Sequence, residues 1–180
     1  MTRDQLEHVI RASAAITKEY TFVIIGSQSL LGQFPGPHEV FTMSAEADIY
    51  PLDAPALADL IDTQIGEGSA FHDAFGYYAQ GVGPETAILP RNWLLRVHRV
   101  QNDGTEGYLG LCLDVVDLFM SKAAAGRDKD RAFCMALFEY GYVQLDQVLG
   151  MVEHMPMEPD EQKRLRRTIQ RWAQAVFTAR

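Results

Sequence analysis

Residues 21–33 have the sequence Thr-Phe-Val-Ile-Ile-Gly-Ser-Gln-Ser-Leu-Leu-Gly-Gln. The residues from Thr21 to Ile25 are apolar and mostly β-branched, which predicts a short buried strand. Gly26 and Ser27 interrupt the pattern, and residues 28–33 are typical of the first turns of a helix. A glycine here lets the backbone turn tightly and approach a ligand, although most Gly-Ser pairs after a strand form only a turn.

A second strand is predicted over residues 45–50, and it carries Glu46 and Asp48. Alternation along a strand places both carboxylates on the same side. Two close carboxylates repel each other unless a cation lies between them, and magnesium takes oxygen ligands that it shares with substrate phosphates. The alternative is an exposed strand face with two ordinary acids.

The remaining pattern predicts an α+β protein with a small mixed sheet flanked by helices and a helical C-terminal part. A hairpin turn is expected at residues 102–104, Asn-Asp-Gly, between strands over 94–100 and 108–113. Asp114 is expected to cap the first helix of the C-terminal part. Residues 1–114 and 115–180 are expected to form one compact unit. Further helices are predicted over 2–18 and 54–65, and a further strand over 77–82.

A third block of interest runs from Asp117 to Asp130. Lys122 lies in a mostly apolar helix, where a lysine either extends to water or meets an anion. Arg127, Lys129 and Asp130 follow a glycine that is expected to end this helix. The alternative is the charged surface of two helices joined by a turn.

Composition limits the class of protein. The chain has 180 residues and a net charge of −8. No apolar run approaches the roughly 18 residues that span a bilayer, so no membrane association is expected. Two cysteines are too few for a disulfide framework, which favours a cytoplasmic location. Residues 158–180 hold six cations against three carboxylates, a net charge of +3, and the rest of the chain carries −11. This segment is either a solvated helix face or a surface that meets an anion.

Other chemistries find little support in the sequence. The chain has no Walker A motif, no Gly-x-Ser-x-Gly elbow and no His-x-x-x-His zinc spacing. His72 is a candidate base, and Cys112 is expected in the core. The aromatic residues Phe75, Tyr77 and Tyr78 are either core or a platform for stacking bases.

Three stretches together resemble nucleotidyltransferases of the DNA polymerase β-like superfamily, and more closely the small bacterial proteins related to AbiEii-type nucleotidyltransferases. The resemblance covers roughly residues 20–140, and its most specific stretch is the last. The stretches are Val23-Ile-Ile-Gly-Ser-Gln-Ser29, Ser44-Ala-Glu-Ala-Asp48, and Asp117-Leu-Phe-Met-Ser-Lys-Ala-Ala-Ala-Gly-Arg-Asp-Lys-Asp130.

The resemblance implies a role for each matching residue in the first two stretches. Gly26, Ser27 and Ser29 would bind the triphosphate of a nucleotide. Glu46 and Asp48 would be catalytic and would hold magnesium or manganese. An acceptor hydroxyl of an RNA, such as tRNA, or of a protein would attack the α-phosphate, and pyrophosphate would leave.

The last stretch implies that Lys122 contacts phosphate charge as a catalytic residue. Arg127, Lys129 and Asp130 would line the nucleotide site, and the helical C-terminal part would close the cleft. The resemblance also implies a toxin-type enzyme with an antitoxin partner.

The chain departs from the superfamily pattern in two places. The usual acid pair is Asp-x-Asp, whereas the first acid here is Glu46, whose carboxylate lies roughly 1.5 Å further out. No third carboxylate is evident on the strand over 77–82, and the nearest candidates are Glu85, Asp103 and Asp114. The alternative function is therefore a catalytically degenerate fold that binds a nucleotide or docks a partner.

Overall fold

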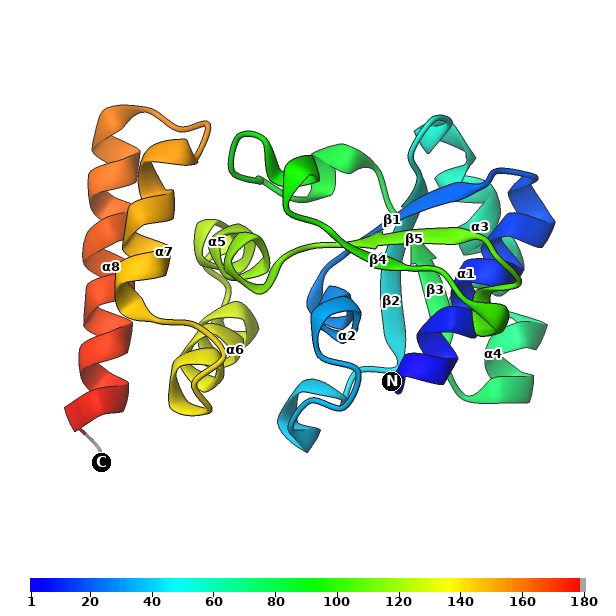
Figure 1. Ribbon diagram of the computed structural model, residues 1–180, viewed down its shortest axis with the longest axis horizontal. Coiled ribbons are helices and arrows are strands. Elements are labelled where there is room, and N and C mark those ends of the chain that lie inside the picture. The colour runs from blue at the N-terminus through cyan, green and yellow to red at the C-terminus, as the bar shows by residue number, and fades with distance from the viewer. Residues whose placement is uncertain (179–180) are drawn as a thin grey trace. The chain divides into compact units, whose positions relative to one another are not determined.

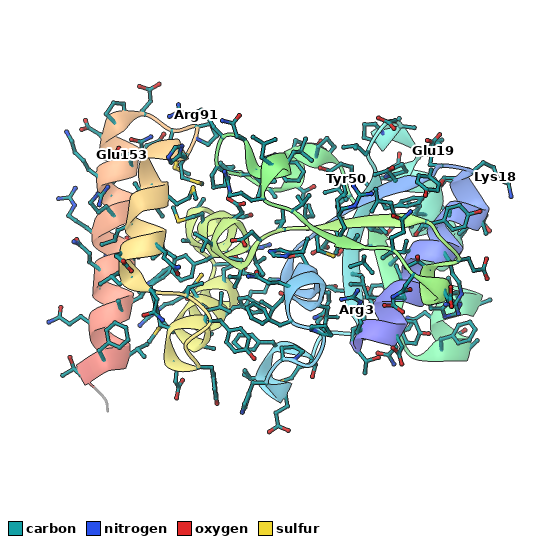
Figure 2. The ribbon with its side chains drawn as sticks, viewed as in Figure 1. Arg3, Lys18, Glu19, Tyr50, Arg91 and Glu153 are labelled. Atoms are coloured by element: carbon teal, nitrogen blue, oxygen red, sulfur yellow. The ribbon has the colours of Figure 1, made fainter. Side chains whose placement is uncertain are left out.

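The computed structural model describes residues 1–178 and divides into two units (Figure 1). The first unit comprises Met1–Thr86 and Arg96–Asp114, and the second comprises Ala87–Leu95 and Val115–Arg180. The second unit thus includes a short segment, Ala87–Leu95, that the sequence analysis placed in the first part. Arg91 in this segment donates a hydrogen bond of 2.7 Å from its guanidinium to the carbonyl oxygen of Glu153 (Figure 2).

The first unit contains one mixed sheet of five strands in the order β3-β2-β1-β5-β4. Strand β1 lies between β2, to which it is antiparallel, and β5, to which it is parallel. Strand β3 is parallel to β2, and β4 is antiparallel to β5. The mixed sheet confirms the predicted α+β class. The strands are β1 (Thr21–Ile25), β2 (Glu46–Pro51), β3 (Tyr78–Gly81), β4 (His98–Val100) and β5 (Leu109–Cys112).

One face of this sheet packs against helices and forms the main core. Alternate residues of each strand contribute to it, among them Phe22 and Ile24 of β1, which are fully buried with Ala47 and Ile49 of β2. Burying a side chain of this size stabilises a fold by about 1.5–3 kcal/mol. Cys112 is buried beside them as predicted. The helices of this unit are α1 (Arg3–Thr17), α2 (Leu30–Gln33), α3 (Ala58–Ile65) and α4 (Ala70–Phe75).

The sequence predicted most of these elements but was wrong about three. Helix α4 was not foreseen; it begins where the Ser69 side chain caps the His72 backbone N–H. Strand β4 is three residues long, because residues 93–95 form a 3₁₀ turn rather than strand. The β4–β5 connection is not a tight hairpin, because Asn102 caps a 3₁₀ turn over Asp103–Thr105.

The second unit is helical, with its own core. Phe119 and Phe138 meet at its centre with ring centroids 5.0 Å apart, and Ile169 and Trp172 of α8 are buried in the same unit. Its helices are α5 (Val115–Ala125), α6 (Asp128–Glu139), α7 (Leu145–Met151) and α8 (Pro159–Thr178). Within residues 1–178, no helix combines the length and the apolar character that crossing a bilayer requires.

Candidate active site

The two carboxylates of β2 lie on the sheet face opposite the main core. Ala47 and Ile49 point into that core, so the alternation of the strand turns Glu46 and Asp48 to the other side, where both are partly exposed. Asp48 is paired with Ile25 of β1 and with Gln80 of β3, and Glu46 is paired with Tyr78. The predicted acid pair therefore shares one face near the end of β1.

The Gly-Ser turn contacts this acid pair directly. Gly26 has φ +68° and ψ −168°, a conformation that is essentially restricted to glycine. A Cβ atom at Gly26 would lie only 1.8 Å from Oδ2 of Asp48. Both the backbone conformation and the Asp48 carboxylate thus require glycine here. The structure brings the first two predicted stretches together at one end of the sheet.

The three polar residues after Gly26 differ in what they can bind. Ser27 is partly exposed at the start of the turn. Ser29 is fully buried, and its hydroxyl donates a hydrogen bond of 2.8 Å to the carbonyl oxygen of Gly26. Gln28 is also buried and donates from its amide nitrogen to the carbonyl oxygen of Phe41. Ser29 and Gln28 therefore shape the turn from inside, whereas Ser27 borders solvent.

A small polar pocket adjoins Glu46. It has a volume of about 190 Å³ and is lined by Glu46, Asp62, Glu67, Tyr78 and Gln80. The Tyr78 hydroxyl donates to Oε2 of Glu46 at 3.1 Å. Burial, the hydrogen bond to Glu46 and the nearby carboxylates raise the pKa of Tyr78 to about 12. Three of the five lining residues are carboxylates, so the pocket is acidic.

Sequence reasoning missed Tyr78, Asp62 and Glu67 as neighbours of Glu46. The parallel pairing of β2 with β3 sets Tyr78 beside Glu46, and this register cannot be read from either strand alone. His72, the candidate base, accepts a hydrogen bond at Nδ1 from the Gly68 backbone N–H.

The neighbouring strand places an amide, not a third carboxylate, beside Asp48. Gln80 is the residue of β3 directly beside Asp48. Of the three candidates, Asp103 lies in the β4–β5 connection, at the opposite end of β5 from the Gly-Ser turn. Asp114 follows β5 and accepts from Nε2 of His98 at 3.0 Å. Glu85 raises the pKa of Tyr50 after the larger effect of burial, which places it near that strand. Among residues 1–178, no three acidic, histidine or cysteine side chains form a metal cluster.

The third predicted stretch forms a compact charged cluster in the second unit. Asp130 is fully buried and binds Nε of Arg127 at 2.6 Å and Nζ of Lys122 at 3.4 Å. Burial alone would raise the pKa of Asp130, but Arg127 and Lys122 outweigh it and hold the pKa below its usual value. Lys122 also lies 4.7 Å from the centre of the Phe133 ring. Asp130 therefore fixes two cations rather than facing a ligand itself.

Two of the three cations of this stretch are accessible to solvent. The Arg127 side chain is 62% exposed although its guanidinium binds Asp130, and Lys129 is exposed on the first turn of α6. The predicted site residues thus form two groups, one in each unit. The three aromatic residues Phe75, Tyr77 and Tyr78 also lie in different places. Phe75 and Tyr77 pack around His8, whereas Tyr78 lines the pocket beside Glu46.

Comparison with known proteins gives one family and no individual relative. Residues 4–180 match the model of the family "Nucleotidyltransferase of unknown function (DUF6036)". Neither the curated proteins nor the solved structures gave a match. Because the match covers nearly the whole chain, the chain belongs to this family of nucleotidyltransferases of unknown function.

Proposed function

We propose that this chain transfers a nucleoside monophosphate from a nucleoside triphosphate to an acceptor hydroxyl of an RNA or a protein. The observation that carries the proposal is the contact between Gly26 and Asp48, because it joins a tight Gly-Ser turn to a carboxylate pair. A turn of this kind lets main-chain groups approach a phosphate closely, and carboxylates beside it suit a phosphate-bound cation.

The donor set fits magnesium or manganese. Glu46 and Asp48 supply carboxylate oxygens on one partly exposed face, and such cations are usually held by one or two carboxylates together with substrate phosphates. When bound, the cation would neutralise charge that develops on the phosphates. Tyr78 would orient Glu46 through its hydrogen bond to Oε2.

The chain's own residues would bind and orient the nucleotide. The backbone N–H groups of the turn and the Ser27 hydroxyl would donate hydrogen bonds to phosphate oxygens. The Ser29 hydroxyl stabilises the turn through its hydrogen bond to the carbonyl oxygen of Gly26. The acceptor oxygen would form a bond to the α-phosphorus, the bond to the pyrophosphate would break, and the acceptor proton would pass to solvent.

A second candidate function rests on Gln80. An amide beside Asp48, where a third carboxylate would assist deprotonation of the acceptor, favours a module that binds a nucleotide or docks a partner without transfer. The longer side chain of Glu46 supports the same alternative, because magnesium demands near-ideal geometry.

We further propose, from the resemblance of the three stretches, that the chain belongs to the polymerase β-like superfamily and is related to AbiEii-type proteins. On this proposal it acts as a toxin with an antitoxin partner. The cysteine usage supports a cytoplasmic location.

The test is transfer of label from each of the four α-labelled ribonucleoside triphosphates, with magnesium, into total RNA and into protein. We expect Asp48→Asn to reduce transfer at least about 100-fold, since it removes one of the two carboxylates. Asp53→Asn makes the same charge change at an exposed site of the same unit and should leave transfer unchanged. Transfer that survives Asp48→Asn would refute the proposal.

A thermal shift with magnesium and a nucleoside triphosphate separates the two candidate functions. Ligand at about 100 times its Kd stabilises a fold by about 2.7 kcal/mol, which is about 5–10 °C for a chain of this size. A shift without transfer indicates the binding module, whereas transfer indicates the enzyme.

A further inference from the structure

Helix α8 carries an excess of positive charge in a strongly acidic chain. Residues 162–178 contain five cations and no carboxylate. Residues 1–161 contain ten cations and 24 carboxylates, a net charge of −14. The positive charge is therefore concentrated on one helix, drawn orange to red in Figure 1.

Three exposed arginines form a stripe along this helix. Arg164, Arg167 and Arg171 are spaced three and four residues apart, so they share one face and extend over about 10 Å. The Arg164 guanidinium reaches only to 4.0 Å from Glu161. Within the described chain, no carboxylate lies within that distance of Arg167 or Arg171, whereas Lys163 binds Asp160 at 3.0 Å. Most of the charge on the stripe is thus available to a partner.

A groove lies beside the stripe in the same unit. It has a volume of about 340 Å³, and its lining combines apolar residues, among them Ala123, Leu165 and Trp172, with the polar residues Glu161, Arg164 and Thr168. A groove with both polar and apolar lining next to a row of arginines suits a partner that alternates negative charges with flat apolar groups. Unpaired bases on a phosphate backbone have this chemistry, and a polyanion without bases does not.

The opposite face of α8 argues against a lipid surface. A helix that binds a membrane inserts its apolar face, but Ile169, Trp172 and Ala173 are buried in the core of the second unit. The charged face and the adjoining groove remain for a partner. Arginine is also the residue best suited to phosphate recognition, because its planar guanidinium can make two parallel hydrogen bonds.

We propose that the arginine stripe Arg164–Arg167–Arg171, with the adjoining groove, binds the phosphate backbone of a single-stranded nucleic acid. This surface goes beyond the proposed transfer reaction. It acts without nucleoside triphosphate and without metal, and it binds whether or not the first unit is catalytically active.

The test is fluorescence anisotropy of a labelled single-stranded RNA of mixed sequence, with the full chain and without magnesium or nucleotide. Three phosphate contacts on a single strand give a slope of about −2 in log K against log salt. Affinity should therefore fall about 20-fold between about 50 and 200 mM KCl. Single-stranded DNA, an RNA duplex and a poly-glutamate peptide serve as competitors.

The decisive variant is Arg167→Ala with Arg171→Ala, which leaves one contact of three. We expect its salt slope to fall to about −0.7, so that the same change in salt weakens binding only about threefold. The matched control, Lys18→Ala with Arg99→Ala, removes two exposed cations from the first unit and should bind like the wild type. Circular dichroism confirms that each variant folds.

Equal competition by single-stranded RNA and DNA supports a site that binds phosphate and unpaired bases. A preference for RNA also supports such a site and indicates that the protein contacts the ribose as well. The inference is overturned if the wild type binds no single strand, if the Arg167/Arg171 variant keeps the wild-type affinity and slope, or if poly-glutamate or the duplex competes as well as the single strand.

Discussion

Replacing Gly26 by alanine tests whether the Gly-Ser turn and the acid pair are one site. The backbone of Gly26 has φ +68° and ψ −168°, where a residue with a Cβ atom is strained by about 1–3 kcal/mol. The added Cβ would also lie 1.8 Å from Oδ2 of Asp48, which must move. Forcing the Asp48 side chain from its rotamer costs about 1 kcal/mol more. Gly26→Ala should therefore lower the free energy of unfolding by about 2–4 kcal/mol.

The assay is urea denaturation of Gly26→Ala in two backgrounds, wild type and Asp48→Ala. Asp48→Ala removes the clash with the carboxylate but not the backbone strain. Gly26→Ala should therefore cost about 1 kcal/mol less in the Asp48→Ala background than in the wild type. Gly76→Ala is the control, because Gly76 has φ +74° with open space around its Cβ position, and only the strain of about 1–2 kcal/mol should appear. An equal cost of Gly26→Ala in both backgrounds would refute the contact.

Two substitutions and one titration test other groups of the chain. Asp130→Asn should cost about 3 kcal/mol at pH 7, because it leaves the Lys122 cation without its buried partner. The pKa of Asp130 is lowered, so its stabilisation is complete above about pH 3.9 and is lost as the pH falls below that value; urea denaturation at pH 7 and 3 should show a smaller loss on acidification for the variant. Burial, and to a smaller extent the charge of Arg11, lowers the pKa of His8. The fold is therefore most stable above about pH 6.5, where His8 is neutral, and loses stability as the pH falls below that value. An NMR titration that gives His8 a pKa above about 6.5 would contradict the structure. Tyr78→Phe removes the hydroxyl that donates a hydrogen bond to Glu46. In thermal-shift titrations with nucleotide, the magnesium concentration that gives half-maximal stabilisation should rise about two- to fivefold. An unchanged concentration would show that Tyr78 does not orient Glu46.

The elements that the sequence predicted well are those whose pattern is local. The β-branched run Thr21–Ile25, the break at Gly26 and the alternation around Asp48 each specify their own conformation, and the structure has all three. Helix α4 was missed because six residues carry little periodicity, and its start depends on a single Ser69 cap.

The site could be predicted only in part, because its surroundings depend on pairing between distant strands. Nothing near Tyr78 in the sequence indicates that it lies beside Glu46; the parallel register of β2 and β3 decides this. The same register puts Gln80 beside Asp48. The sequence suggested a third carboxylate only from other segments, at Glu85, Asp103 or Asp114. The burial of Asp130 was likewise hidden, because an acid in the first turn of a helix is usually a solvated cap.

Under the proposed function, Glu46, Asp48 and the Gly-Ser turn together form one site for a divalent cation and a triphosphate. The most direct measurement is paramagnetic broadening of backbone amide signals by manganese, with a non-hydrolysable nucleoside triphosphate analogue, in the wild type and in Asp48→Asn. We predict that signals from residues 26–29 and 46–48 broaden first in the wild type and stay sharp in the variant. Broadening centred on Asp62 and Glu67, or broadening unchanged in Asp48→Asn, would contradict the claim.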